Sequence, residues 1–179
     1  KNIFFIDHSK GHIFYGYFSN NKKENSISIS MDAFGDFVNY RAVNFYYKKN
    51  KLFFKEIVKG GNFIIGRLYR YITLILGLKP NEHEYKVMGL SAYGSPRYTD
   101  LIHENYLDLT KKFYSLNTDY LDYHSCLLGN FNGQINEDIV PKRNSDSKIL
   151  KVHADLASSA QKCYENVLLK IAKNIKTLT

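Results

Sequence analysis

The C-terminal segment constrains the fold most, because its apolar residues recur with the period of a single long α-helix. They lie three or four residues apart, at Val152, Leu156, Ala160, Cys163, Val167, Ile171, Ile175 and Leu178. This spacing gathers them into one stripe along an amphipathic helix. An apolar stripe of this length has to be covered. We therefore expect either a second copy of the chain, forming a homodimer, or further protein chain to pack against it.

Composition limits the class of protein. Of the 179 residues, 44% are hydrophobic and 23% are charged, which is typical of a folded domain rather than a disordered chain. No run of about 18 apolar residues occurs, so we expect neither a membrane-spanning helix nor a membrane partner. The cysteines, Cys126 and Cys163, are too few for a disulfide scaffold and suit a cytoplasmic protein.

The net charge of +8 admits an anionic partner such as a nucleic acid. The basic residues are spread along the chain, however, and no run of them is longer than two. Charge alone therefore gives no reason to expect nucleic-acid binding.

The first residues have the pattern of a strand followed by a helix. Residues 3–6 are aromatic or β-branched and apolar, which predicts a buried strand. The polar residues 7–9 suit a helix cap, and residues 12–18 predict a short aromatic helix.

Strand patterns follow. Residues 26–32 alternate between apolar residues and serine or aspartate, which predicts a half-buried strand ending in Asp32. Residues 41–47 and 52–58 predict two further strands that form a hairpin with a charged turn at 48–51.

Helix patterns dominate the next part. Residues 63–76 predict a helix capped by Asn62 and stopped by Gly77. A turn of helix is expected at residues 85–90, and a helix at residues 98–115.

Two turn signals complete the pattern. Asn132 and Gly133 predict a hairpin turn, and residues 143–148 predict a polar linker. Strands and helices together predict an α/β protein of α+β character with a mixed sheet.

The spacing of two histidines suggests a metal site. His8 and His12 are four residues apart, so on a helix both imidazole rings lie on one face. Asp32 ends the next predicted strand, and in a sheet of neighbouring strands its carboxylate comes up beside the pair. Two imidazoles and one carboxylate suit Fe(II), Zn or Mn and leave positions open for a substrate. The alternative interpretation is two surface histidines and a turn residue.

A second group of chemically active residues lies in the segment 82–94. Glycines such as Gly89 let a backbone approach a ligand closely. Lys86 can bind a phosphate or carboxylate oxygen as a point charge. An ordinary charged loop explains the same residues equally well.

Four motifs occur in order along the chain and resemble one enzyme family. They are Asp-His-Ser-Lys-Gly-His at 7–12, Met-Asp-Ala-Phe-Gly-Asp at 31–36, Ile-Gly-Arg-Leu-Tyr at 65–69, and Glu-Tyr-Lys-Val-Met-Gly-Leu-Ser-Ala-Tyr-Gly-Ser-Pro at 84–96. A weaker match, Asp-Leu-Ala-Ser-Ser-Ala-Gln, begins at Asp155. The set resembles the nodulation, cephem and tobramycin O-carbamoyltransferases, and the segment 84–94 is its most specific part.

The resemblance implies a fold and a reaction. Such enzymes are similar to the actin and sugar kinase group, with RNase-H-like lobes. ATP and carbamoyl phosphate give carbamoyl-adenylate in a separate YrdC-like domain, and a metal-bearing domain moves the carbamoyl group to the hydroxyl of a small molecule or sugar.

The resemblance also implies residue roles. His8, His12 and Asp32 would be ligands of a divalent metal, with iron favoured and zinc or manganese as alternatives. Glu84, Lys86 and Gly89 would line the nucleotide or carbamoyl-adenylate site.

The chain departs from the family pattern at several positions. Ser9 stands where the family has a second histidine, Ala33 where it has glycine, and Asp36 where it has glutamate. The family continues into a C-terminal lobe and a YrdC-like domain. We therefore expect residues 1–179 to be a partial N-terminal domain that is inactive by itself.

Two other functions fit parts of the pattern. The related tRNA threonylcarbamoyl transferases share the spacing of His8 and His12 and would explain the positive charge, but the segment 84–94 argues against them. A non-enzymatic module that docks a partner through its long helix is the other alternative, and it predicts that His8, His12 and Asp32 point apart.

Overall fold

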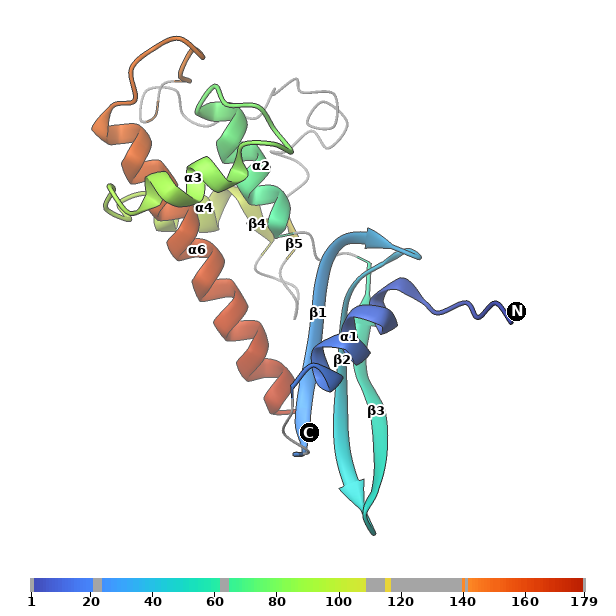
Figure 1. The fold of residues 1–179 in the computed structure, drawn as a ribbon. Helices are drawn as coiled ribbons and strands as arrows, with labels where there is room; N and C mark the ends of the chain where they lie inside the picture. The colour runs from blue at the N-terminus through green and yellow to red at the C-terminus, as the bar shows by residue number, and fades with distance from the viewer. Residues whose placement is uncertain are drawn as a thin grey trace. The chain divides into compact units, whose positions relative to one another are not determined.

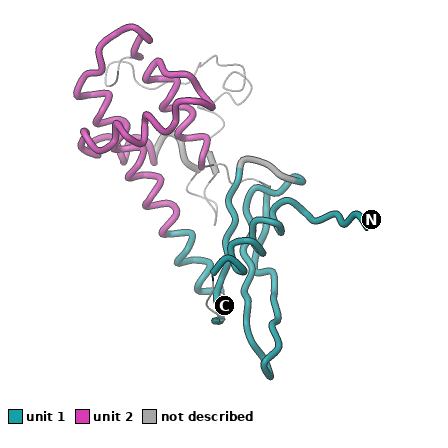
Figure 2. The backbone as a smooth tube through the Cα atoms, in the orientation of Figure 1, with its two compact units in different colours: residues 1–64, 170–179 teal, residues 65–169 magenta. Residues whose placement is uncertain are grey.

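A computed structural model describes residues 2–20, 24–61, 65–108, 115–116, 140 and 142–178. The chain forms two compact units (Figure 2). Unit 1 comprises residues 1–64 and 170–179, and unit 2 comprises residues 65–169. Helices and antiparallel strands occur in the described parts (Figure 1), which confirms the α+β class.

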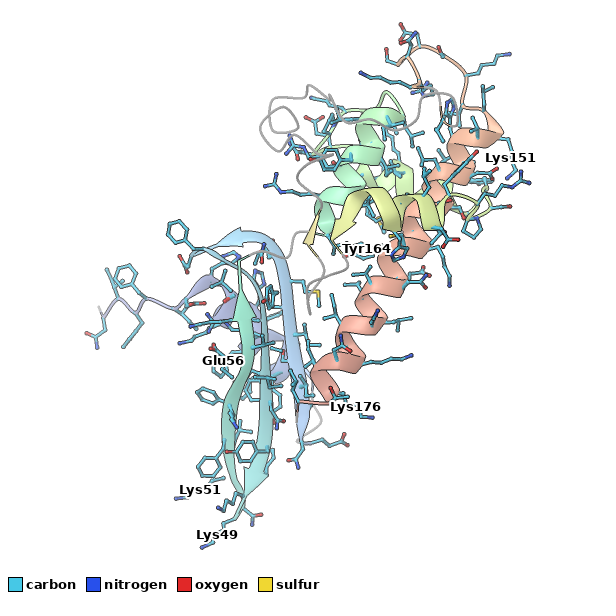
Figure 3. The ribbon with its side chains drawn as sticks, turned by 180° about the vertical axis from the view of Figure 1, so that it is seen from behind. Lys49, Lys51, Glu56, Lys151, Tyr164 and Lys176 are labelled. Carbon is cyan, nitrogen blue, oxygen red and sulfur yellow. The ribbon has the colours of Figure 1, made fainter. Side chains whose placement is uncertain are left out.

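Unit 1 contains a three-stranded antiparallel sheet in the order β1-β2-β3. Its strands are β1 (Ser26–Gly35), β2 (Val38–Lys48) and β3 (Lys51–Gly60). The predicted strand at 26–32 and the predicted hairpin are both confirmed. The hairpin turns at Lys49 and Asn50, whose φ angles of 51° and 58° are those of a type I′ turn. Its lysines lie at the far tip of the sheet (Figure 3).

One helix, α1 (His8–Phe18), packs on the sheet of unit 1. It contains the predicted helix at 12–18 and begins four residues earlier, because Asp7 caps it by accepting a hydrogen bond from the Lys10 N–H at 2.9 Å. Ile13 and Tyr17 pack into a small core with strand β2, where Tyr17 stacks on Phe45 with ring centroids 4.0 Å apart.

The serine side of β1 faces α1. The Ser28 hydroxyl donates to the Ile13 carbonyl at 3.0 Å, and a Cβ added to Gly16 would lie 3.3 Å from the same hydroxyl oxygen. Small residues on both elements therefore allow the helix to lie close to the strand.

The prediction of a buried strand at residues 3–6 is wrong. The four side chains of this segment are 65% to 97% exposed. A strand needs a hydrogen-bonded neighbour, and in the described residues β1, β2 and β3 pair only with one another. The segment instead leads away from the sheet (Figure 1).

Unit 2 is mainly helical. Its elements are α2 (Gly66–Ile75), α3 (Glu84–Ser91), α4 (Thr99–Tyr106), β4 (Leu107–Asp108), β5 (Ser115–Leu116) and most of α6 (Lys151–Lys176), whose last residues belong to unit 1. Among the described helices, none is both long and apolar enough to cross a membrane.

Several helix predictions can be compared with unit 2. Gly77 ends α2 as predicted, with φ at 61° and the Leu78 N–H bonded to the Thr73 carbonyl. The expected helix at 98–115 extends only over α4, after which the chain enters β4. Two predicted features lie outside the described residues, namely the Asn62 cap and the turn at Asn132 and Gly133, and so does Cys126.

The long helix α6 confirms the apolar period of the C-terminal segment. The chain itself covers most of this stripe, although Leu178 at its end is 44% exposed. Leu156, Ala160 and Cys163 are 0% exposed in unit 2, and Ile175 is 2% exposed in unit 1. The homodimer through this helix stays a prediction.

The predicted polar linker at 143–148 has an unexpected buried arginine. Arg143 is 7% exposed, and its Nε donates to the Leu76 carbonyl at 2.6 Å. Its Nη1 donates to the carbonyls of Ser145 and Ser147. Arg143 thus ties the linker to the C-terminal end of α2, where helix carbonyls need donors.

Candidate metal centre

The first two turns of α1 bring two imidazole rings together. Asp7 fixes the start of the helix, so His8 and His12 occupy successive turns of one face. Their ring centroids are 4.7 Å apart in an edge-to-face arrangement, and their Nε2 atoms are 3.1 Å apart. The sequence spacing predicted this pairing.

Asp32 on β1 meets the histidine pair. It lies on the same side of β1 as Ser28 and Ser30, the side that α1 covers, because side chains alternate along a strand. Its Oδ2 is 2.7 Å from His8 Nε2 and 3.4 Å from His12 Nε2. The three side chains therefore converge, although Asp32 reaches the pair because α1 packs on β1 and not because a strand at 3–6 adjoins it.

The donor atoms fit a shared divalent ion. All three lie within 4.8 Å of one another. Ligand atoms about 2.0–2.2 Å from one ion lie roughly 3 Å apart, close to the separations observed here. The side chains of His8, His12 and Asp32 are 44%, 54% and 40% exposed, so a substrate could reach the site.

Hydrogen bonding alone does not explain both the contact of His8 Nε2 with Asp32 and its contact with His12 Nε2. A proton on His8 Nε2 can be donated to Asp32 or directed at His12, but not both. A carboxylate offers only acceptor oxygens, and each neutral imidazole carries one N–H. An ion between the three atoms would take the two nitrogen lone pairs and the carboxylate charge together.

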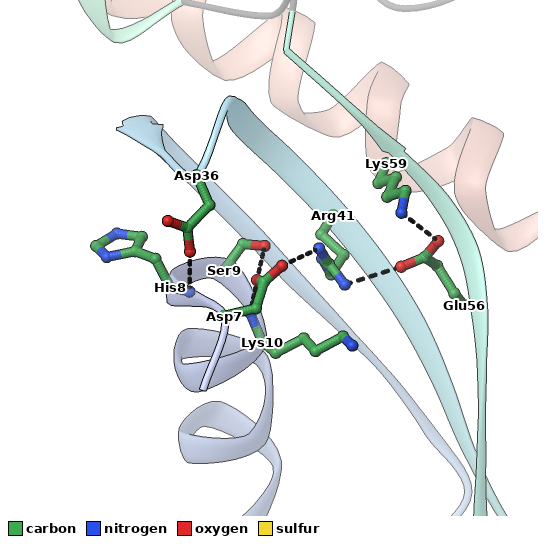
Figure 4. Close-up of polar contacts among 8 residues, drawn as sticks. All are labelled: Asp7, His8, Ser9, Lys10, Asp36, Arg41, Glu56 and Lys59. Atoms are coloured by element: carbon green, nitrogen blue, oxygen red, sulfur yellow. Dashed lines mark hydrogen bonds and ion pairs between the residues drawn. The ribbon is translucent and has the colours of Figure 1, made fainter. Parts of the chain in front are cut away.

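A second layer of polar contacts holds the start of α1 (Figure 4). The Asp36 carboxylate, in the turn between β1 and β2, accepts a hydrogen bond from the His8 backbone N–H at 2.8 Å. Asp7 also accepts from the Ser9 hydroxyl at 2.8 Å. The backbone N–H of Lys10, together with Ser9 and the Arg41 guanidinium, holds the pKa of Asp7 below its ordinary value.

No sequence motif singled out Arg41 and Glu56. Arg41 on β2 bonds Asp7 through Nη2 and Glu56 through Nη1, each at 2.9 Å. The available signal was an arginine at the inward position of a strand whose next inward residues are Val43 and Phe45. A charged residue in such a row needs a partner inside the fold.

The residues expected at a nucleotide site lie on α3, in unit 2. Glu84 is the first residue of that helix, and its Oε1 accepts a hydrogen bond from the N–H of Asn81 in the preceding loop at 2.6 Å. Lys86 is exposed, with Nζ 5.9 Å from the centre of the Tyr85 ring. Gly89 is also exposed, and a Cβ added to it would meet nothing within 4 Å.

The end of the same motif packs against α6. A Cβ on Gly94 would come 1.9 Å from the Ala154 carbonyl oxygen, so this glycine is required by close backbone contact. The Ser95 N–H donates to Asp155 Oδ1 at 2.7 Å, and the Tyr98 N–H donates to the Ser159 hydroxyl at 2.9 Å.

Asp155 also bonds Lys151, at the start of α6 (Figure 3). This hydrogen bond, followed by the one from Ser95, lowers the pKa of Asp155.

The sequence comparisons identify the family. A family model described as "Carbamoyltransferase N-terminus" matches residues 1–178, and the chain belongs to this family. It is also similar to the uncharacterized protein sll1178 of Synechocystis sp. (strain ATCC 27184 / PCC 6803 / Kazusa), with 35% identity over 112 residues. That alignment covers 62% of this chain and 18% of the relative, so the chain corresponds to a minor part of that protein.

Proposed function

We propose that this chain is part of an O-carbamoyltransferase whose divalent-metal site is formed by His8, His12 and Asp32. Iron is the favoured ion, with zinc or manganese as alternatives for two imidazoles and one carboxylate. Membership of the carbamoyltransferase family supports carbamoyl chemistry. The observation that carries the proposal is the convergence of three metal-binding atoms from two elements.

A bound divalent ion supplies Lewis-acid polarisation of an oxygen. The chain's own residues supply its setting. His8 and His12 would offer their Nε2 lone pairs to the ion, and the Asp32 carboxylate would offset part of its charge. The Asp36 carboxylate holds the His8 backbone in place. Because all three side chains are partly exposed, a hydroxyl acceptor can approach from solvent.

The carbamoyl donor in this proposal is carbamoyl-adenylate, made from ATP and carbamoyl phosphate elsewhere in the whole protein. Lys86 would attract a phosphate oxygen, since its ammonium group is exposed. Gly89 would allow the donor to approach the α3 backbone. Glu84 would act by holding the Asn81 loop at the start of α3. The acceptor is the hydroxyl of a small molecule or sugar.

The prediction of the cellular location rests on the sequence alone. We propose a cytoplasmic protein, and Cys163 is consistent with this because it is a buried free thiol. Burial raises the pKa of this thiol to about 12, so it is not a reactive group. The docking-module alternative predicted that His8, His12 and Asp32 point apart, whereas they converge.

The direct test is a transfer assay with the full-length protein. Carbon-labelled carbamoyl phosphate, ATP and a panel of hydroxyl acceptors are incubated with the enzyme before and after chelation. We expect label in an acceptor only with ATP, its loss after chelation, and its return with Fe(II), Zn(II) or Mn(II). Transfer that is independent of the metal, or the absence of ATP-dependent transfer to any acceptor, would contradict the proposal.

A further inference from the structure

Arg41 occupies an unusual place for a charged side chain. It is 2% exposed, on the central strand β2, and lies on the side of the sheet that α1 covers. Val43 and Phe45 follow on the same side and belong to the apolar core. A buried guanidinium is unfavourable unless opposite charges engage it.

Two carboxylates from different elements engage it (Figure 4). Arg41 Nη2 donates to Asp7 Oδ2 and Nη1 donates to Glu56 Oε2, both at 2.9 Å. The planar guanidinium presents these donors in a fixed geometry. Arg41 therefore connects the residue that caps α1 with strand β3.

Asp7 divides its two oxygens between the sheet and the helix. Oδ2 bonds Arg41, while Oδ1 accepts from the Lys10 N–H at 2.9 Å. One rigid carboxylate thus fixes the first turn of α1 to β2, and β2 pairs with the strand that carries Asp32. The first residue of that turn is His8.

We infer that Arg41 is a positioning residue of the candidate metal centre, which holds the first turn of α1 in the orientation that brings His8 and His12 to Asp32. This inference rests on the proposed function. The new element is that the geometry of the centre depends on Arg41, whose hydrogen bonds go to Asp7 and Glu56 and not to the three candidate ligands.

The direction in which metal affinity changes when Arg41 is replaced separates a positioning role from simple electrostatic repulsion. Removing a positive charge near a bound cation reduces repulsion, so Coulomb's law predicts tighter metal binding. Loss of positioning predicts weaker binding. Loss of an outer residue that orients ligands typically weakens metal affinity by about 10- to 100-fold.

The experiment uses the full-length protein and Co(II) as the probe. Arg41→Met removes the two ion pairs and keeps an unbranched, apolar side chain. Arg41→Lys keeps the positive charge but has a single ammonium group in place of the planar guanidinium with its two Nη donors. Lys59→Met is the matched control, because the exposed Lys59 also pairs with Glu56, with Nζ 3.7 Å from Oε1, but is not among the partners of Asp7 in the described part of the chain. Co(II) affinity is measured from the absorption of the bound ion, and amide hydrogen exchange is measured over residues 8–11.

We expect Arg41→Met to weaken Co(II) binding about tenfold or more and to speed exchange over residues 8–11. Arg41→Lys should give a smaller loss, and Lys59→Met should give neither change. Equal or tighter Co(II) binding by Arg41→Met, or an equal loss in Lys59→Met, overturns the inference. If Arg41→Met does not fold, wild-type affinity in Arg41→Lys overturns it.

The exchange measurement separates this inference from the proposed function. If the wild-type protein binds no Co(II), the metal proposal fails and exchange alone decides the role of Arg41. Faster exchange in Arg41→Met than in Lys59→Met then supports the positioning of the three-residue cluster. Equal exchange in both variants overturns it.

Discussion

Two aspartates in family-like motifs have opposite environments in the two units. Asp32 in unit 1 is 40% exposed and directs its carboxylate at two histidines. Asp155 in unit 2 is 3% exposed and accepts hydrogen bonds from the Ser95 N–H and from Lys151. The comparison shows that a motif aspartate can be a candidate ligand or a structural clamp. Exposure and the nature of the partner distinguish the two roles.

The largest effect should follow from removing a ligand in unit 1. His12→Ala takes away one of the three converging atoms, and we expect carbamoyl transfer to fall by roughly 100-fold or more because metal catalysis contributes several kcal/mol. The assay of labelled carbamoyl transfer measures it in the full-length protein. Tyr15→Ala is the control, because Tyr15 lies one turn further along α1 and is 77% exposed. Equal losses in both variants would mean that α1 itself, and not the ligand, had failed.

The second prediction tests the clamp in unit 2 with a pair of glycines. Gly94→Ala should lower the free energy of unfolding by about 1–3 kcal/mol, because its Cβ would overlap the Ala154 backbone. Gly89→Ala should raise it by about 0.5–1 kcal/mol, because Gly89 lies in the exposed helix α3 with open space around it. Denaturant titration compares the two, and a Gly94→Ala protein as stable as wild type would show that the close contact with α6 is absent.

The third prediction concerns the pH dependence of the Asp155 clamp. Its folded pKa lies below the ordinary value of 3.8, so the ionised carboxylate stabilises the fold above that value. This contribution is lost as the pH falls through the folded pKa. Protection of the Ser95 amide against hydrogen exchange should therefore decrease below about pH 4 in wild type.

Asp155→Asn provides the control for this titration. Asparagine keeps an acceptor oxygen but cannot ionise, so the acid-dependent loss of Ser95 protection should flatten. An unchanged pH dependence in the variant would assign the effect to other carboxylates.

The smallest expected effect lies at two turns of unit 1. Phe37 has a φ of 60° and is 93% exposed, so it strains the backbone without burying its ring. Phe37→Gly should raise the free energy of unfolding by about 1 kcal/mol. Asn50→Gly, in the other positive-φ turn, should raise it by only a few tenths, because asparagine tolerates this conformation. Thermal unfolding compares the variants, and a Phe37→Gly protein less stable than wild type would contradict this account.

Local patterns predicted the elements that depend on local physics. The hairpin of β2 and β3 follows from alternation and a charged turn, and α6 follows from its apolar period. The approach of His8 to His12 follows from helix geometry alone. The arrival of Asp32 was also expected, but for a different structural reason, since no strand forms at residues 3–6.

Long-range packing explains what the sequence did not predict. The pattern predicts a polar linker around Arg143, yet this residue is buried, and its Nε donates to the Leu76 carbonyl, 67 residues away. The role of Arg41 depends on the register of β2 with β3 and on where α1 begins. Neither is encoded in a short window of residues, because both require elements to be placed against each other.

Metal analysis of the full-length protein tests the central claim most directly. The protein is purified from cells grown in medium that contains iron, zinc and manganese. The number of bound metal ions per chain is then measured for wild type and for His8→Ala, His12→Ala and Asp32→Ala. We predict about one divalent ion per wild-type chain at this site and its loss in each variant. An ion content that is the same in wild type and in all three variants would contradict the account.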